Sequence, residues 1–127
     1  MQMAIITSHV PDAAYGLLGP QMAATIIQDH TRIPCIVIAV TRDDDKDSLK
    51  KALSDYFGAR RPVIGFSALS GREDLFSLAK ELKDEGAVTI LAGPQADADF
   101  RGEEGWQQHP HRFRGLSDSF RFALHGP

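Results

Sequence analysis

The sequence predicts an α/β fold: a five-stranded parallel sheet with helices on both faces. Short apolar runs, such as residues 4–7 and 34–40, are typical of buried strands. Between them, apolar residues recur at helical spacing, as they do from about residue 19 to 30. Because nearly continuous apolar strands alternate with amphipathic helices, we expect a sheet covered on both sides and joined by right-handed crossovers.

The first three elements are predicted as a strand over residues 4–7, a helix from about residue 19 to 30 and a strand over residues 34–40. The helix places four apolar side chains on one stripe, namely Met22, Ala23, Ile26 and Ile27. An acidic turn, residues 43–45, then leads into a second helix that Gly58 can end in a left-handed conformation. The stripe of this helix comprises Leu49, Ala52, Leu53, Tyr56 and Phe57.

The third strand is predicted over residues 62–66 and the fourth over residues 87–91. Between them, Ser70 and Glu73 fit a capping box, which predicts the start of a third helix there, and Gly86 ends it. Its core face consists of Leu75, Leu78, Ala79 and Leu82. Beyond Gly93 we predict a short helix within residues 97–108, an edge strand over 111–114 and a last helix over 116–124. In that helix Phe120, Ala123 and Leu124 face inward.

Five such strands in one short chain suit the flavodoxin-like (Rossmann-like) order 2-1-3-4-5. In that order the chain reverses direction between strands one and three, so their C-terminal loops part and open a crevice. The loops concerned are residues 8–19 and 67–71. The first is long for a connection of this kind, in which about 2–6 residues are typical, and this favours a ligand-binding role.

The composition limits the classes of function that this chain could have. With 127 residues and 13.9 kDa the chain forms one domain. Its formal charge of −3 provides no field for nucleic acid, and no apolar run is long enough to span a membrane. The N-terminus lacks the features of a signal peptide, so we expect a cytoplasmic protein. Cys35, the single cysteine, is expected to pack as a small buried apolar group.

Several chemistries hosted by this fold are excluded by the residues at the strand ends. A phosphoryl-accepting receiver needs an acidic pair after strand one and an aspartate after strand three, where this chain has Thr7, Ser8 and Ser67. A flavin-phosphate loop would be rich in glycine, whereas residues 8–15 are bulky and include Pro11. No dinucleotide or phosphate-loop glycine motif occurs, and spacing identifies no nucleophile and base pair.

The remaining residues resemble those of cobalamin-binding domains. Ser67-Ala68-Leu69 is similar to their Ser-x-Leu element, and Ala92-Gly93 stands in place of their glycine pair. Residues 65–71, 78–83 and 92–95 follow one another as in the N-terminal domain of cobalamin-dependent radical S-adenosylmethionine proteins. The loop over residues 11–24 fits the same branch.

The resemblance implies that this chain holds cobalamin, with the nucleotide tail of the cofactor in the crevice beside strands one, three and four. Residues 9–16 would lie against the corrin. The implied cofactor-binding residues are His9, Pro11, Tyr15, Gly16, Ser67, Leu69, Ser70, Gly93, Pro94 and Gln95. His9 is not implied as an axial ligand, because the motif's Asp two residues earlier and Gly three residues later are Thr7 and Asp12 here.

One cysteine cannot hold the [4Fe–4S] cluster of a radical enzyme. We therefore expect residues 1–127 to be the N-terminal domain of a longer chain, without catalytic activity or a metal site of its own. The cluster, S-adenosylmethionine and the catalytic domain would belong to the rest of that chain. The alternative is a degenerate flavodoxin-like docking or spacer domain that binds no cofactor. Ala92 and the missing histidine motif favour this alternative. If it holds, we expect Tyr15, Leu17 or Leu18 to fill the crevice.

Overall fold

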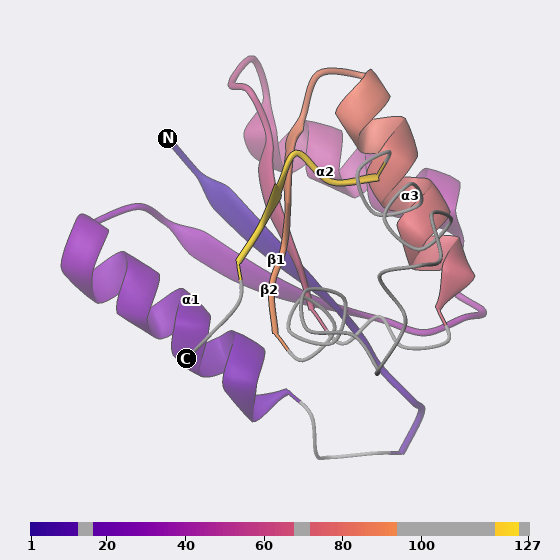
Figure 1. The fold of residues 1–127 in the computed structure, drawn as a ribbon, viewed down its shortest axis with the longest axis horizontal. Helices are drawn as coiled ribbons and strands as arrows, with labels where there is room; N and C mark the ends of the chain where they lie inside the picture. Colours follow the sequence, from indigo (N-terminus) through magenta and orange to yellow (C-terminus); the bar gives the residue numbers. More distant parts are fainter. Residues whose placement is uncertain (13–16, 68–71, 94–118, 125–127) are drawn as a thin grey trace, which may run out of the picture.

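A computed structural model of the chain describes residues 1–12, 17–67, 72–93 and 119–124 (Figure 1). Five parallel strands form one sheet in the order β2-β1-β3-β4-β5, which confirms the predicted flavodoxin-like α/β fold. The strands are β1 (Met3–Ser8), β2 (Cys35–Val40), β3 (Val63–Ser67), β4 (Val88–Leu91) and β5 (Phe122–Ala123). The helices are α1 (Leu18–Thr31), α2 (Lys46–Phe57) and α3 (Glu73–Asp84).

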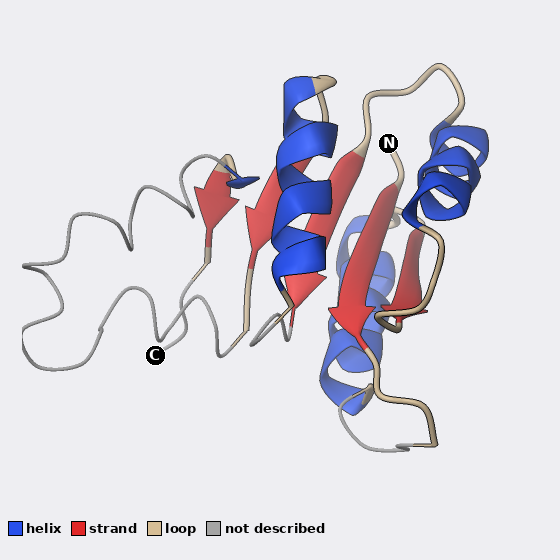
Figure 2. Cartoon of the chain, turned by 90° about the vertical axis from the view of Figure 1, so that its right-hand side faces the viewer, coloured by secondary structure: helices blue, strands red, loops and turns tan. Residues whose placement is uncertain are grey.

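Helices lie in front of the sheet and behind it in Figure 2, so both faces are covered, as predicted. The chain passes leftward through α1 to β2 and then rightward through α2 and α3, and right-handed crossovers therefore put α1 on one face and the other two helices on the opposite face. Within the described segments, no helix combines the length and the apolar character needed to cross a membrane.

The larger hydrophobic core lies between the sheet and the helices α2 and α3. The predicted core face of α3, Leu75, Leu78, Ala79 and Leu82, is buried throughout. Phe66 of β3 and Phe120 meet edge to face there, with ring centroids 5.5 Å apart. A smaller cluster of Ile5, Ala24 and Cys35 holds α1 against the other face, and this confirms the buried apolar role of Cys35.

Strand register places a line of residues on the α1 face of the sheet. Thr7 of β1 lies opposite Ser67 of β3, and Gly65 of β3 lies opposite Ile90 of β4. Side chains alternate between the two faces of a strand. Because Ile5 packs against α1, Thr7 two residues later faces the same side.

The start of α3 differs from the prediction. The helix begins at Glu73 with Arg72 as its N-cap and without a side-chain cap, so it starts later than a cap at Ser70 predicts, and the bonds of the predicted capping box are not tested. The buried side chain of Arg72 is held there by Asp74 of α3 and by the carbonyl of Val40 in β2. Ser70 itself lies outside the described residues.

The end of the sheet also differs. The strand in fifth position is β5, which lies within the segment predicted as the last helix, so that helix is wrong at residues 122–123. Phe120 is buried as predicted, but Ala123, in the edge strand β5, and Leu124, directly after it, are exposed. The helix predicted within residues 97–108 and the strand predicted at 111–114 lie outside the described residues. Ala52 of α2 is exposed and does not join the predicted stripe.

Candidate functional site

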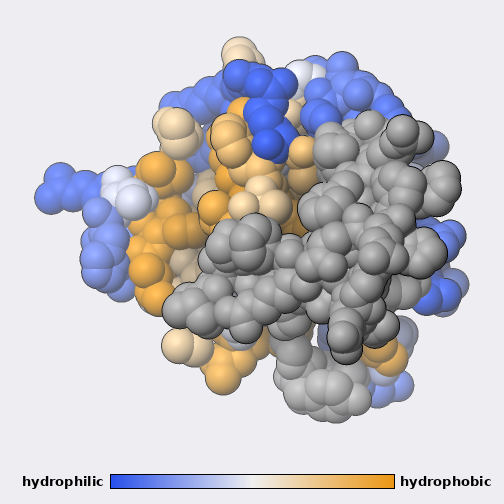
Figure 3. Space-filling view, in the orientation of Figure 1, coloured by the Kyte–Doolittle hydropathy of each residue, from blue (hydrophilic) through white to orange (hydrophobic). Residues whose placement is uncertain are grey.

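A groove of about 610 Å³ runs between α1 and the sheet, and we call it the α1 groove. Its walls come from α1, from the three strands β1, β3 and β4, and from the residues that follow β4 and β5. Thirteen residues line it: Met3, Ile5, Gly19, Pro20, Ala23, Ile27, Gly65, Phe66, Ser67, Ile90, Ala92, Gly93 and Leu124. Figure 3 shows hydrophobic side chains gathered on this side of the molecule. The volume lies within the roughly 300–1,000 Å³ that is usual for small-molecule sites.

The groove exists because small residues stand where a packed core would have large ones. Gly65 lies in the middle of β3, and a Cβ added there would be 3.5 Å from Cε of Met3 and 3.7 Å from Cγ1 of Ile5. A Cβ added to Gly19 would meet nothing within 4 Å. Glycine inside a strand weakens it and often marks a close approach by a ligand or another backbone. Because Gly65 has no side chain, the groove is deeper at this point of β3.

Ser67 and Gly93 meet at the carboxyl end of the groove, as the sequence predicts for two neighbouring strand ends. A Cβ on Gly93 would lie 3.4 Å from Oγ of Ser67. Gly93 has φ of +85°, a conformation that L side chains rarely adopt, so its backbone favours glycine. Ala92 also lines the groove.

Thr7 supplies a buried hydroxyl beside this end of the groove. The residue is fully buried and lies next to Ser67 in register. Its Oγ1 has no hydrogen-bond partner among the described residues. A buried polar group without a partner costs about 1–3 kcal/mol, so the position favours a ligand or water that can bond to this hydroxyl.

His9 and Pro11 line a second hollow, of about 430 Å³, at the carboxyl ends of β1 and β2. We call it the β1–β2 pocket, and its other lining residues are Ser8, Val10, Thr41, Arg42, Asp43 and Arg72. His9 is half-buried, and its backbone N–H donates to the carbonyl of Val40. The structure therefore brings together His9 with Pro11, and Ser67 with Gly93, in two neighbouring hollows at the same edge of the sheet.

An ion-pair cluster fixes the wall of the β1–β2 pocket. Arg72 is 6% exposed and donates to both carboxylate oxygens of Asp74 at 2.8 Å and to the carbonyl of Val40 at 2.8 Å. Lys46 lies 3.1 Å from the same carboxylate. The hydrogen bonds from Arg72, helped by Lys46, hold the pKa of Asp74 well below its usual range. This cluster ties the start of α3 to the end of β2 and the start of α2.

The other predicted site residues, Tyr15, Gly16, Leu69, Ser70, Pro94 and Gln95, lie outside the described residues. Two of the residues that the docking alternative expects to plug the crevice are described. Leu18 is 69% exposed, and neither Leu17 nor Leu18 lines the α1 groove. Tyr15, the third, lies outside the described residues.

In the described segments, no group of three or more His, Cys, Asp and Glu side chains could hold a metal ion. Cys35 is buried beneath α1, and burial raises the pKa of its thiol. A thiol with a raised pKa is a poor nucleophile and a poor metal ligand at neutral pH.

Sequence reasoning missed the roles of Thr7 and Arg72. Thr7 ends an apolar strand and resembles any strand residue in the sequence, whereas its lack of a partner is visible only in three dimensions. Arg72 follows a loop and precedes Asp74, a spacing that is compatible with an exposed helix start. A glycine inside the apolar run of β3 could have indicated the groove from the sequence alone. Glycine weakens a strand, and its missing side chain leaves space beside the strand at Gly65.

No family model, no curated protein and no solved structure matches the chain. The function therefore has to be argued from the site itself.

Proposed function

We propose that this chain is a corrinoid-binding module of a radical S-adenosylmethionine enzyme, holding cobalamin without a histidine axial ligand. The observation that carries the proposal is the α1 groove. Its floor and carboxyl end are formed by small residues, among them Gly65, Ser67, Ala92 and Gly93. A slender nucleotide tail needs such a channel at the carboxyl edge of the sheet, below the flat macrocycle.

The residues present fit this group in shape and in polarity. Met3, Ile5 and Ile27 provide apolar walls for an aromatic base, while Ser67 provides a hydroxyl at the carboxyl end. The buried hydroxyl of Thr7 lies beside Ser67 and lacks a partner. A polar atom of the tail, or a water molecule that bridges to it, would satisfy this hydroxyl.

The remaining residues of this chain would position the macrocycle above the groove. His9 and Pro11 lie at the same edge of the sheet, on the rigid wall that Arg72 and Asp74 maintain. Bound cobalamin supplies a cobalt centre able to carry a methyl group for the attached catalytic domain. The domain itself orients the cofactor and keeps water away from its tail, and we propose that cluster and S-adenosylmethionine binding belong to the rest of the parent chain.

The test is a titration of the purified chain with hydroxocobalamin, followed by a desalting column and a visible spectrum. The expected result is that cofactor colour elutes with the protein. Gly65→Val should weaken binding about 10- to 100-fold, since filling a fitted site costs about 1–3 kcal/mol. Ala52→Leu, on the exposed face of α2, is the control and should bind as the parent does.

Colourless protein at high concentration would contradict the proposal, provided that circular dichroism shows the chain to be folded. Equal binding by the parent and by Gly65→Val would place the cofactor outside the α1 groove. The first result would remove the proposed function, and the second would remove only the assignment of the groove as its site.

The docking alternative keeps one observation in its favour. The exposed apolar side chains Met22, Ile26 and Leu124 border the groove side of the molecule, with exposures of 54%, 53% and 60%. Exposed apolar patches of this kind mark surfaces that contact other proteins. A chain that does not bind hydroxocobalamin but that associates with its catalytic domain through these residues would support this second function.

A further inference from the structure

The strand β2 forms one end of the sheet, and within the described part of the chain it pairs with β1 alone (Figure 2). Its 6 residues are all apolar, with no charged residue, proline or glycine among them. Ile36 is 37% exposed, and Ala39 is exposed as well. Natural sheets protect their edges with charges, prolines or bulges, because an open apolar edge pairs with another strand. The sequence of β2 provides no such protection.

The hydrogen bonds between β2 and β1 show which backbone groups of β2 point away from β1. The carbonyls of Pro34 and Val40 accept from the N–H groups of Met3 and His9, so these two residues direct their backbone groups toward β1. Backbone groups alternate between the two edges of a strand. Cys35, Val37 and Ala39 therefore present their N–H and C=O groups to the outer edge.

These three residues are arranged symmetrically about Val37, and so are their neighbours. The run Cys35-Ile36-Val37-Ile38-Ala39 reads small, Ile, Val, Ile, small in both directions. We propose that a second copy of this chain pairs with β2 in antiparallel register, on a two-fold axis that passes beside Val37. This surface lies at the opposite end of the sheet from β4 and β5, and the proposal does not depend on the proposed cofactor.

In this register every outward backbone group of β2 finds a partner. Val37 pairs with Val37 of the second copy, and Cys35 pairs with Ala39, as hydrogen-bonded pairs. Ile36 lies opposite Ile38 on the face that carries α2, where both side chains lose exposed apolar surface. A strand that is self-complementary in this way is typical of a two-fold interface, in which the same patch meets itself.

The charges that flank the strand agree with the antiparallel direction. Exposed Arg32 precedes β2, whereas residues 41–45 after it comprise Thr41, Arg42 and three aspartates. Neither Arg32 nor Asp43 forms an ion pair with another described residue. In the proposed register Arg32 of one copy lies opposite Arg42 of the other, beside the three aspartates that make residues 41–45 net acidic, whereas parallel pairing would bring like ends together.

Analytical ultracentrifugation of the 127-residue chain tests the interface. We expect a species of twice the 13.9 kDa chain mass. Ile36→Lys should weaken dimerisation at least 10-fold, because two buried ammonium groups would face the apolar edge. Ile26→Lys is the matched control, since Ile26 is 53% exposed and belongs to α1 and not to the edge strand β2, and it should leave the dimer unchanged.

A monomer at about 100 μM, where an interface of about micromolar Kd would be saturated, would overturn the proposal. So would a dimer that Ile36→Lys leaves intact, because the interface would then lie elsewhere on the chain.

A second measurement checks the register and does not depend on how Ile36→Lys folds. In a Cys35→Ala background, Val37→Cys should cross-link to its symmetry mate under mild oxidation, because hydrogen-bonded antiparallel pairs have Cα atoms about 5.5 Å apart. Ile26→Cys in the same background should give no cross-link. A dimer without the Val37→Cys cross-link would overturn the proposed two-fold position.

Discussion

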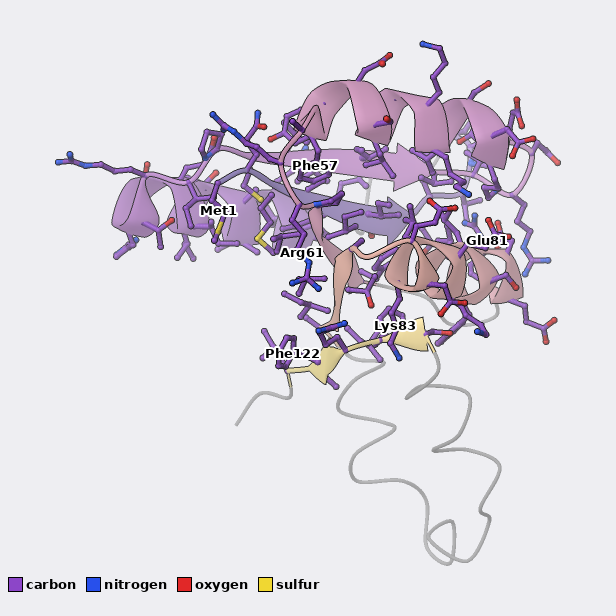
Figure 4. The ribbon with its side chains drawn as sticks, turned by 90° about the horizontal axis from the view of Figure 1, so that it is seen from above. Met1, Phe57, Arg61, Glu81, Lys83 and Phe122 are labelled. Carbon is purple, nitrogen blue, oxygen red and sulfur yellow. The ribbon has the colours of Figure 1, made fainter. Side chains whose placement is uncertain are left out.

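The two faces of the sheet differ in how completely their apolar side chains are buried. Beneath α2 and α3, large side chains such as Phe66, Leu75 and Leu78 are at most 2% exposed and form one continuous core. Beneath α1 the buried cluster is small, and the strands beyond it border the α1 groove. Phe57, on α2, is 2% exposed, whereas Phe122, on the edge strand β5, is 55% exposed (Figure 4).

This difference separates stability from the proposed function. Large apolar residues on the α2 and α3 face stabilise the fold, so the α1 face can accept small residues without losing it. Glycine and alanine at the groove give up buried apolar area, each methylene of which is worth about 0.8 kcal/mol. Such a loss is tolerable only because the opposite face supplies enough buried area. Substitutions on the two faces should therefore have different consequences.

The largest effect is expected from Leu75→Ala. Leu75 is fully buried in the core under α3, and removing its side chain should lower the free energy of unfolding by about 2–5 kcal/mol. Ile27→Ala, at the half-buried wall of the α1 groove, should cost only about 1 kcal/mol because the groove is already open there. Urea denaturation followed by circular dichroism measures both. Equal losses in the two variants would contradict the contrast between the faces.

A smaller effect is expected from the ion-pair cluster at the carboxyl edge. Asp74→Asn leaves the buried Arg72 without its charged partner and should destabilise the fold by about 1–3 kcal/mol at neutral pH. Asp55→Asn, which removes an exposed pair with Lys51 at 3.0 Å, is the control and should change stability by less than about 0.5 kcal/mol.

The same cluster gives a pH dependence whose sign follows from the lowered pKa of Asp74. The unfolded carboxyl has the ordinary pKa of about 4, so the stabilisation is fully present above that pH. It is lost as the pH falls below about 4 toward the lower pKa of the folded state. The parent and Asp74→Asn should therefore approach each other in stability on acidification. A difference that stayed constant down to pH 2 would contradict this assignment.

The smallest effect is expected at Ala92. Ala92→Gly widens the carboxyl end of the groove by one methyl group. Since one excess carbon in a closely fitted site costs about 1 kcal/mol, hydroxocobalamin should bind about fivefold more tightly. Ala39→Gly, in a strand away from the groove, is the control and should leave affinity unchanged. Weaker binding by Ala92→Gly would show that the alanine methyl contacts the ligand favourably.

The sequence predicted the fold well because its strands and helices have distinct periodicities. The strand β4 and the core face of α3 were predicted almost residue by residue, and the order of strands followed from their number and from right-handed crossovers. The error at residues 122–123 has a physical cause. A two-residue edge strand is defined by pairing with β4, and such pairing leaves no periodic pattern in the sequence.

The site was predicted less completely than the fold. Proximity of Ser67 and Gly93 could be inferred because parallel strands end at one edge of the sheet. The position of Arg72 depends on contacts between three elements, and the unpartnered hydroxyl of Thr7 depends on what surrounds it. Neither property is encoded in local spacing. The division into an apolar groove and a polar pocket could be seen only from the folded chain.

The most direct test of the central proposal compares cobalamin with cobinamide, which keeps the corrin ring but lacks the nucleotide tail. If the α1 groove holds the tail, equilibrium dialysis should show hydroxocobalamin bound at least about 10-fold more tightly than diaquocobinamide, and Gly65→Val should abolish that preference. Equal affinities for the two corrinoids, or a preference that survives Gly65→Val, would contradict the assignment of the groove.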